Sequence, residues 1–173
     1  MRRRVLVPLL AVLTASGLAL GSVGTLAGAS VSAAKPAACA GKTKKKAIKQ
    51  IKATWDIFLN GTAGRTLDER KVVVQGADDP ALLELFNSIF AANADLAAMT
   101  TTRVDTVKCT GKKAADVTFF LINATTGDPL LPDAQAGGAV IEDGIWKVST
   151  EAVCSLIALA QPASIESGPC ALT

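Results

Sequence analysis

The stretch AVIEDGIWKVS at residues 139–149 decides the fold, because it is the strongest short hairpin signal in the chain. At its centre lies Asp143-Gly144, a pair that readily adopts the left-handed backbone of a type I′ turn. The flanking runs 139–142 and 145–149 are rich in β-branched and aromatic residues, which favour strands. These residues predict two antiparallel strands joined by a two-residue turn.

Two further strands are predicted upstream of this hairpin. Residues 100–109 and 115–123 are rich in β-branched residues and are joined through the short polar segment 110–113. A long, proline-containing connection over 124–135 then leads to the closing hairpin. The four runs predict an antiparallel meander of about four strands.

Helical spacing dominates the chain before residue 100. The apolar residues that recur at this spacing are Ile48, Ile51, Trp55, Phe58 and Leu59. They predict an amphipathic helix over 44–59. Thr66 and Glu69 have the form of a capping box, which predicts a short second helix that ends at Gly76.

The remaining helices are marked by their first residues. Asp79-Pro80 offers an N-cap followed by proline, which predicts a third helix that fades near Asn93. Thr150-Glu151 begins a short last helix. Helices followed by a meander indicate an α+β fold, with N-terminal helices packed on a curved antiparallel sheet and a short C-terminal helix.

The first 34 residues have the form of a secretory signal peptide. A basic start, MRRR, precedes an apolar run, and the small residues SVSAA at 30–34 suit cleavage after Ala33 or Ala34. An uncleaved membrane anchor is the alternative, because the apolar run is long enough to span a bilayer. Lipid attachment at Cys39 is not expected, because no branched aliphatic residue lies three positions before it.

The predicted organisation is therefore a signal peptide at 1–34, a leader at 35–43, one domain at 44–160 and a tail at 161–173. We predict a secreted, extracellular protein that either is released or stays at the cell wall. The signal holds three of the 18 basic residues and none of the 15 acidic residues, so the rest of the chain is formally neutral.

All four cysteines follow the predicted signal, and an even number in an exported chain indicates two disulfides. They are Cys39, Cys109, Cys154 and Cys170. Of the three possible pairings we favour Cys109–Cys154 with Cys39–Cys170, which would join a strand to the last helix and one chain end to the other. A free reactive pair is the alternative.

The chain resembles the mycobacterial low molecular weight secreted antigen family, specifically its C-terminal domain. The segments that carry this resemblance are Asn60-Gly61, 66–76, Asp95-Leu96 with 102–107, 115–118, 138–140, 143–149 and 154–156. The resemblance implies an exported protein without established catalytic activity. The order of elements also suits a cone-shaped fold similar to that of nuclear transport factor 2 and the cystatins. The four cysteines and the lysine-rich start depart from the family pattern, and we carry over no functional residue.

The composition excludes several kinds of catalytic site. The chain has no histidine, so histidine-based triads and histidine-ligated metals are ruled out, and no nucleotide-binding loop or paired-cysteine motif is present. We predict no cofactor, no metal and no enzymatic activity. The alternative is a small-molecule lyase or isomerase that uses Asp105 or Asp116 as a pocket base. The chain also lacks the tyrosine that related cone-shaped isomerases use, so solvent-facing aspartates are favoured.

The aromatic residues have two possible roles. Trp55, Phe58, Phe86, Phe90, Phe119 and Trp146 either fill the core between helices and sheet or line an apolar pocket for a lipid-like ligand. Trp146 should point inward from its strand, toward the first helix.

A run of lysines opens the first helix. It comprises Lys42, Lys44, Lys45, Lys46, Lys49 and Lys52. Lysines in a first turn oppose the helix dipole, so capping does not explain them. They form either a solvated helix face or a patch for anionic cell-envelope polymers or lipid headgroups. Nucleic acid is not an expected partner, because no stacking aromatics interrupt the run.

Overall fold

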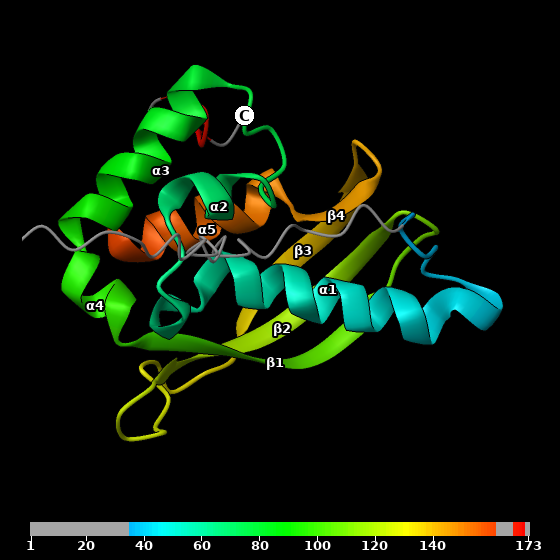
Figure 1. The fold of residues 1–173 in the computed structure, drawn as a ribbon, viewed down its shortest axis with the longest axis horizontal. Helices are drawn as coiled ribbons and strands as arrows, with labels where there is room; N and C mark the ends of the chain where they lie inside the picture. The colour runs from blue at the N-terminus through cyan, green and yellow to red at the C-terminus, as the bar shows by residue number, and fades with distance from the viewer. Residues whose placement is uncertain (1–34, 162–167, 172–173) are drawn as a thin grey trace, which may run out of the picture. The chain divides into compact units, whose positions relative to one another are not determined.

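The computed structural model describes residues 35–161 and 168–171. The predicted signal peptide lies outside the described residues. The described residues form an α+β fold, as predicted (Figure 1). Its longer elements are α1 (Lys44–Leu59), α3 (Pro80–Ala92), β1 (Thr100–Cys109), β2 (Ala114–Asn123), β3 (Gln135–Glu142), β4 (Ile145–Val148) and α5 (Thr150–Ala160). Its short ones are the 3₁₀ turns η1 (Gly41–Thr43) and η2 (Gly61–Ala63) and the helices α2 (Leu67–Lys71) and α4 (Ala94–Ala98).

The four strands form one antiparallel meander in the order β1-β2-β3-β4. The closing hairpin is confirmed, because Asp143 and Gly144 have φ values of 50° and 77°, which a type I′ turn requires. Pairing between β1 and β2 shifts between Val104 and Thr106. One residue of β1 is therefore unpaired at this point, as in a β-bulge. A bulge increases the local twist and helps the sheet to curl.

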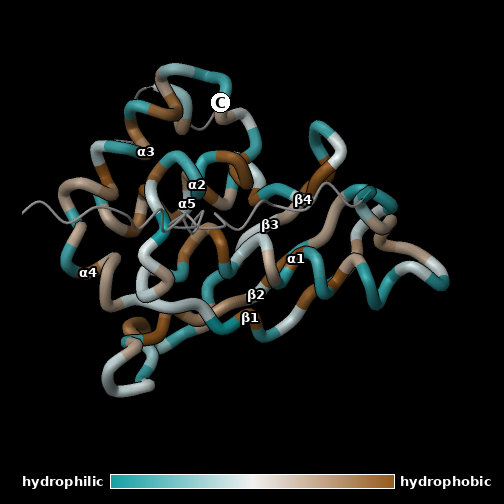
Figure 2. The backbone as a smooth tube through the Cα atoms, in the orientation of Figure 1, coloured by the Kyte–Doolittle hydropathy of each residue, from teal (hydrophilic) through white to brown (hydrophobic). Residues whose placement is uncertain are grey.

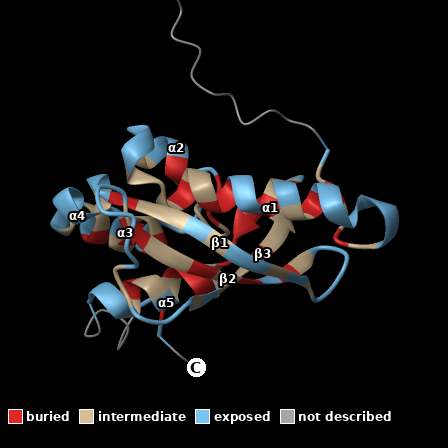
Figure 3. Ribbon diagram, turned by 90° about the horizontal axis from the view of Figure 1, so that it is seen from below, coloured by how far each residue is buried: buried red, intermediate tan, exposed pale blue. Residues whose placement is uncertain are grey.

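The core lies between α1 and the sheet. Helix α1 packs against both edge strands, β1 and β4, so the sheet curves around it (Figures 1 and 3). Hydrophilic and hydrophobic residues alternate along α1, and its buried side includes Ile51 and Trp55 (Figure 2). The Trp55 ring lies 4.5 Å from that of Phe119, between ring centroids, and directly over Gly137. A Cβ atom at Gly137 would lie 2.5 Å from the Trp55 ring, so the helix can approach only because this residue is glycine.

The structure corrects two element boundaries and adds one short helix. Helix α2 ends at Lys71 and not at Gly76, because the following residues join the sheet edge: the Val148 N–H donates to the Val73 carbonyl at 2.8 Å. Helix α4 was not predicted. Strand β3 begins at Gln135 and runs through two glycines that carry little strand signal.

The predicted disulfide pairing is wrong. The disulfides are Cys39–Cys109, with Cα atoms 5.6 Å apart, and Cys154–Cys170, with Cα atoms 5.2 Å apart. The leader passes beside the β1–β2 turn, where the Cys39 N–H donates to the Lys112 carbonyl at 2.9 Å. Cys39 therefore reaches the end of β1, and Cys170 meets Cys154 of α5. No free cysteine remains among the described residues.

Candidate functional site

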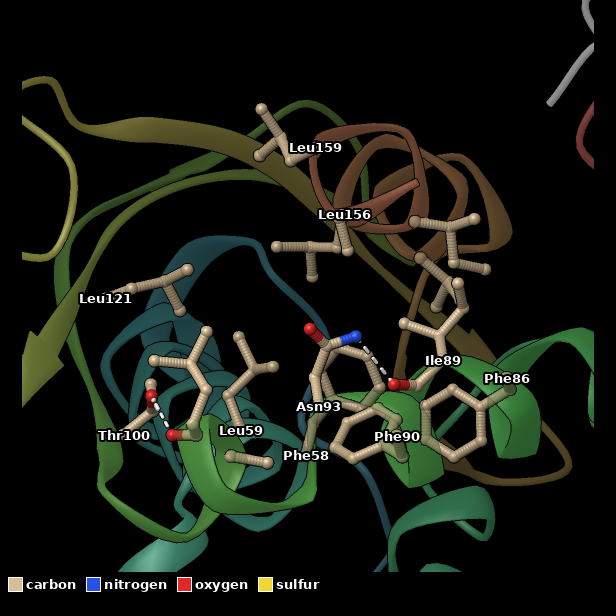
Figure 4. Close-up of a pocket in the computed structure, with 15 residues that line it drawn as sticks. Phe58, Leu59, Phe86, Ile89, Phe90, Asn93, Thr100, Leu121, Leu156 and Leu159 are labelled. Atoms are coloured by element: carbon tan, nitrogen blue, oxygen red, sulfur yellow. Dashed lines mark hydrogen bonds between the residues drawn. The ribbon is translucent and has the colours of Figure 1, made fainter. Parts of the chain in front are cut away.

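An apolar cavity of about 370 Å³ opens where α3, α4 and α5 meet the far end of α1 (Figure 4). Its lining residues are Phe58, Leu59, Phe86, Ile89, Phe90, Asn93, Leu96, Ala97, Thr100, Leu121, Val153, Leu156, Ile157, Leu159 and Ala160. Cavities of this size hold small-molecule ligands in other proteins.

The six aromatic residues named from the sequence divide into two groups. Phe58, Phe86 and Phe90 form one wall of the cavity, with ring centroids between 4.5 and 6.4 Å apart. Trp55, Phe119 and Trp146 do not line it and are buried in the core. Helical spacing alone could not separate the groups, because Trp55 and Phe58 lie on the same side of α1.

A buried arginine holds the aromatic wall in place. The Arg70 side chain donates to the carbonyls of Phe58 at 2.7 Å and Asn60 at 3.1 Å, which lie at the end of α1 and have no helical partner. Its guanidinium carbon also lies 5.5 Å from the centre of the Phe90 ring. Burial lowers the pKa of Arg70, and the positive charge of Arg65 lowers it further. Arg70 thus ties α2, α1 and α3 together behind the cavity.

Two polar side chains line the cavity, and both present acceptor atoms to it. Asn93 Nδ2 donates to the Ile89 carbonyl at 2.8 Å, which identifies the other amide atom as the oxygen. That oxygen makes no hydrogen bond within the described residues and points into the cavity opposite Leu156 (Figure 4). Thr100 Oγ1 already donates to the Leu96 carbonyl at 2.6 Å.

Sequence reasoning missed these two residues and the contribution of α5. Leu156 and Ile157 line the cavity and lie in the predicted last helix, to which the sequence assigned no role. The available signal was the number of apolar residues in this helix, which also include Val153 and Leu159. Asn93 was predicted only as a helix end.

The mouth of the cavity is open and apolar. Leu96 and Leu159 line it with half of their surface exposed, at 50% and 53%. Helix α4 can form this rim only because residue 61 is glycine: a Cβ atom there would collide with the Ala97 carbonyl. Large exposed apolar side chains around a cavity mark a surface that can receive an apolar molecule.

The carboxylates of the alternative enzymatic hypothesis are not at the cavity. Asp105 and Asp116 are both exposed on the sheet, and neither lines it. No ionisable side chain is among the lining residues. In residues 35–161 and 168–171, no group of three or more cysteine, aspartate or glutamate side chains is placed to hold a metal ion.

The six lysines of the predicted basic run are all exposed. They occupy η1 and the part of α1 from Lys44 to Lys52, whereas the cavity is lined by Phe58 and Leu59 at the C-terminal end of α1. Lys52 Nζ donates to the Val104 carbonyl at 3.2 Å. The two candidate sites are therefore at opposite ends of one helix.

A comparison with protein-family models matches residues 44–164 to the low molecular weight antigen MTB12, C-terminal domain. No curated protein and no solved structure matches the chain. Within the described part of the chain, no helix is long and apolar enough to cross a membrane. The family match begins at the first residue of α1, covers well over half of the chain and agrees with the resemblance noted in the sequence. The chain therefore belongs to the low molecular weight antigen MTB12 family, through the C-terminal domain of that family.

Proposed function

We propose that the protein is an exported, non-catalytic binding protein that holds a neutral, apolar small molecule in the cavity between α3 and α5. The observation that carries this proposal is the lining of the cavity, which is almost entirely hydrocarbon and contains no ionisable group. Apolar walls supply affinity by removing ligand surface from water. A few fixed polar atoms then orient the ligand.

The polar atoms at the cavity define the ligand further. A carboxylate or ammonium group inside the cavity would have no charged partner, which is strongly unfavourable, so a charged ligand would have to keep that group at the open mouth. The Asn93 oxygen accepts hydrogen bonds, so it suits a ligand that carries one hydroxyl or N–H donor. The favoured class is thus a lipid-like alcohol or amide whose polar group lies inside the cavity.

A matched pair of fluorescent probes tests this assignment. N-phenyl-1-naphthylamine is neutral and carries one N–H, and 8-anilinonaphthalene-1-sulfonate has the same rings with an added sulfonate. We expect the neutral probe to bind with fluorescence enhancement, and the anionic probe at least about tenfold more weakly, because its charge would be desolvated. Equal or stronger binding of the anionic probe would contradict a neutral-ligand site.

Two variants of α5 test whether the neutral probe binds in the cavity. Leu156→Trp adds a ring that fills the space and should abolish binding of the neutral probe. Ser155→Trp adds the same ring at the neighbouring exposed position, which does not line this cavity, and should leave binding unchanged. Circular dichroism of both variants is the control for folding. Phe119 is not suited to this test, because it is buried against Trp55 and its replacement would report on folding.

The aspartate variants distinguish the binding protein from the rival enzyme. Asp105→Asn and Asp116→Asn should leave probe binding unchanged, because both carboxylates lie outside the cavity. A positioned acid or base typically contributes about 10²–10⁴-fold to a rate. If either folded variant lost a measurable turnover, the binding-protein proposal would fail. Native mass spectrometry of protein from its own culture medium would show a retained ligand directly.

Export has its own test. N-terminal sequencing of the extracellular protein should begin near Lys35, because small residues end the signal-like segment only there. Both disulfides are compatible with an oxidising, extracytoplasmic compartment. A mature protein that begins at Met1, or that carries lipid on Cys39, would disprove cleavage at this site.

A further inference from the structure

Two more lysines join the basic run in the folded chain. Lys112 and Lys113 form the exposed β1–β2 turn, and the leader hydrogen-bonds to this turn through the Cys39 N–H and the Lys112 carbonyl. The Cys39–Cys109 disulfide holds the two segments together. We call the six lysines of residues 42–52, together with Lys112 and Lys113, the basic end. We propose that the basic end binds a flexible polyanion, such as a phosphate- or carboxylate-bearing polymer of the cell envelope.

The positive charge of the basic end is not neutralised within the fold. None of its eight lysines forms an ion pair in the described part of the chain. Residues 35–55 and 106–115 contain no aspartate or glutamate. The nearby β3–β4 hairpin carries two acids, but Lys147 pairs with both, at 2.7 Å to Glu142 and 2.6 Å to Asp143. Asp116 lies opposite Lys108 in the sheet register and not opposite the basic end.

This charge works against the stability of the fold. The first turn of α1 carries Lys44, Lys45 and Lys46 and no acidic residue, so three positive charges face the positive end of the helix dipole. Each such charge is unfavourable at low salt, because it adds to the positive potential at the start of the helix. A bound polyanion would remove this repulsion and would release its own counterions.

The distribution of the lysines favours a flexible polymer over a flat membrane. Lys44, Lys45 and Lys46 are consecutive, so their side chains project around the helix, about 100° apart. A flexible chain can follow such a curved surface. Of the nearby apolar residues of α1, Ala47 and Ile51 are fully buried and Ile48 is partly buried, so this part of the helix offers no exposed apolar side chain to a bilayer.

The basic end and the cavity can be occupied together. Helix α1 has 16 residues and is about 24 Å long. The basic end lies at its start, and Phe58 and Leu59 of the cavity lie at its end. A polymer bound at the basic end would leave the apolar rim of the cavity free. This inference therefore does not depend on the proposed ligand.

Binding of long-chain linear polyphosphate, measured by calorimetry at several salt concentrations, tests the proposal. The variants Lys45→Gln/Lys46→Gln and Lys112→Gln/Lys113→Gln should each weaken binding at least about fivefold at low salt and reduce the log–log salt slope by about one to two. The control Lys71→Gln/Arg103→Gln removes the same charge elsewhere and should change affinity less than about twofold.

Three results would overturn the proposal. The first is wild-type affinity in Lys112→Gln/Lys113→Gln, which would show that the turn is not part of the site. The second is an equal loss in the control, which would show a response to net charge alone. The third is tight binding to phosphatidylglycerol vesicles without binding to polyphosphate, which would indicate a membrane surface. All three variants should bind N-phenyl-1-naphthylamine as the wild type does, so a failure of this proposal can be distinguished from a failure of the cavity proposal.

Discussion

Replacing Trp146 by alanine is expected to lower the free energy of unfolding by about 3–5 kcal/mol. Its side chain points inward, as predicted, and is only 3% exposed. Its Nε1–H donates to the Ala37 carbonyl at 3.1 Å, and its own carbonyl accepts from Thr54 Oγ1 of α1 at 3.1 Å. The residue therefore connects β4, the leader and the first helix, and alanine would leave a cavity among all three.

Urea denaturation followed by circular dichroism measures this loss. Trp146→Phe is the matched control, because it keeps a ring and removes only part of the volume and the N–H donor. We expect the phenylalanine variant to lose less stability than the alanine variant. In the phenylalanine variant the Ala37 carbonyl loses its donor, which should lower the free energy of unfolding by about 1–3 kcal/mol. A change below about 1 kcal/mol in the alanine variant would mean that Trp146 contributes little to the core.

Removing the Cys39–Cys109 disulfide with Cys39→Ala/Cys109→Ala is expected to lower the free energy of unfolding by about 4 kcal/mol. The bridge closes a loop with a sequence separation of 70 residues, which greatly restricts the unfolded chain. Cys154→Ala/Cys170→Ala should lower it by about 3 kcal/mol, because that loop spans only 16 residues.

Denaturation midpoints of the two double variants test this order. Peptide mapping without reduction should recover Cys39 linked to Cys109 and Cys154 linked to Cys170, and thiol titration of the denatured, unreduced protein should find no free thiol. A larger loss from the shorter loop would contradict the chain-entropy argument. A peptide that links Cys109 to Cys154 would contradict the structure itself.

The disulfides also show how this chain extends its family domain. Cys109 and Cys154 lie inside the matched residues 44–164, whereas Cys39 and Cys170 lie outside them. Each bridge therefore attaches a flanking segment to the domain. The leader bridge is the one that brings the lysine-rich start beside the β1–β2 turn.

The sequence by itself determined the elements whose causes are local. Thr66 and Glu69 form the predicted capping box, with both reciprocal hydrogen bonds present. Asp79 caps α3 through the Ala81 N–H at 2.9 Å, and proline follows it. The Asp143-Gly144 turn sets the register of the closing hairpin. Each of these depends on groups within about four residues of one another, so short sequence patterns are sufficient to predict them.

Only the tertiary structure decided the features that depend on distant segments. The pairing of the cysteines follows from the path of the leader past β1, which the spacing of cysteines does not encode. The early end of α2 follows from the hydrogen bonds of Val148 with Val73 and Gln75, which are far from it in the chain. The cavity also depends on distant segments, because Phe58 and Trp55 lie on one side of α1 but contact different partners. Such contacts form only after the chain has folded, and a periodic pattern in one segment carries no information about which segment will face it.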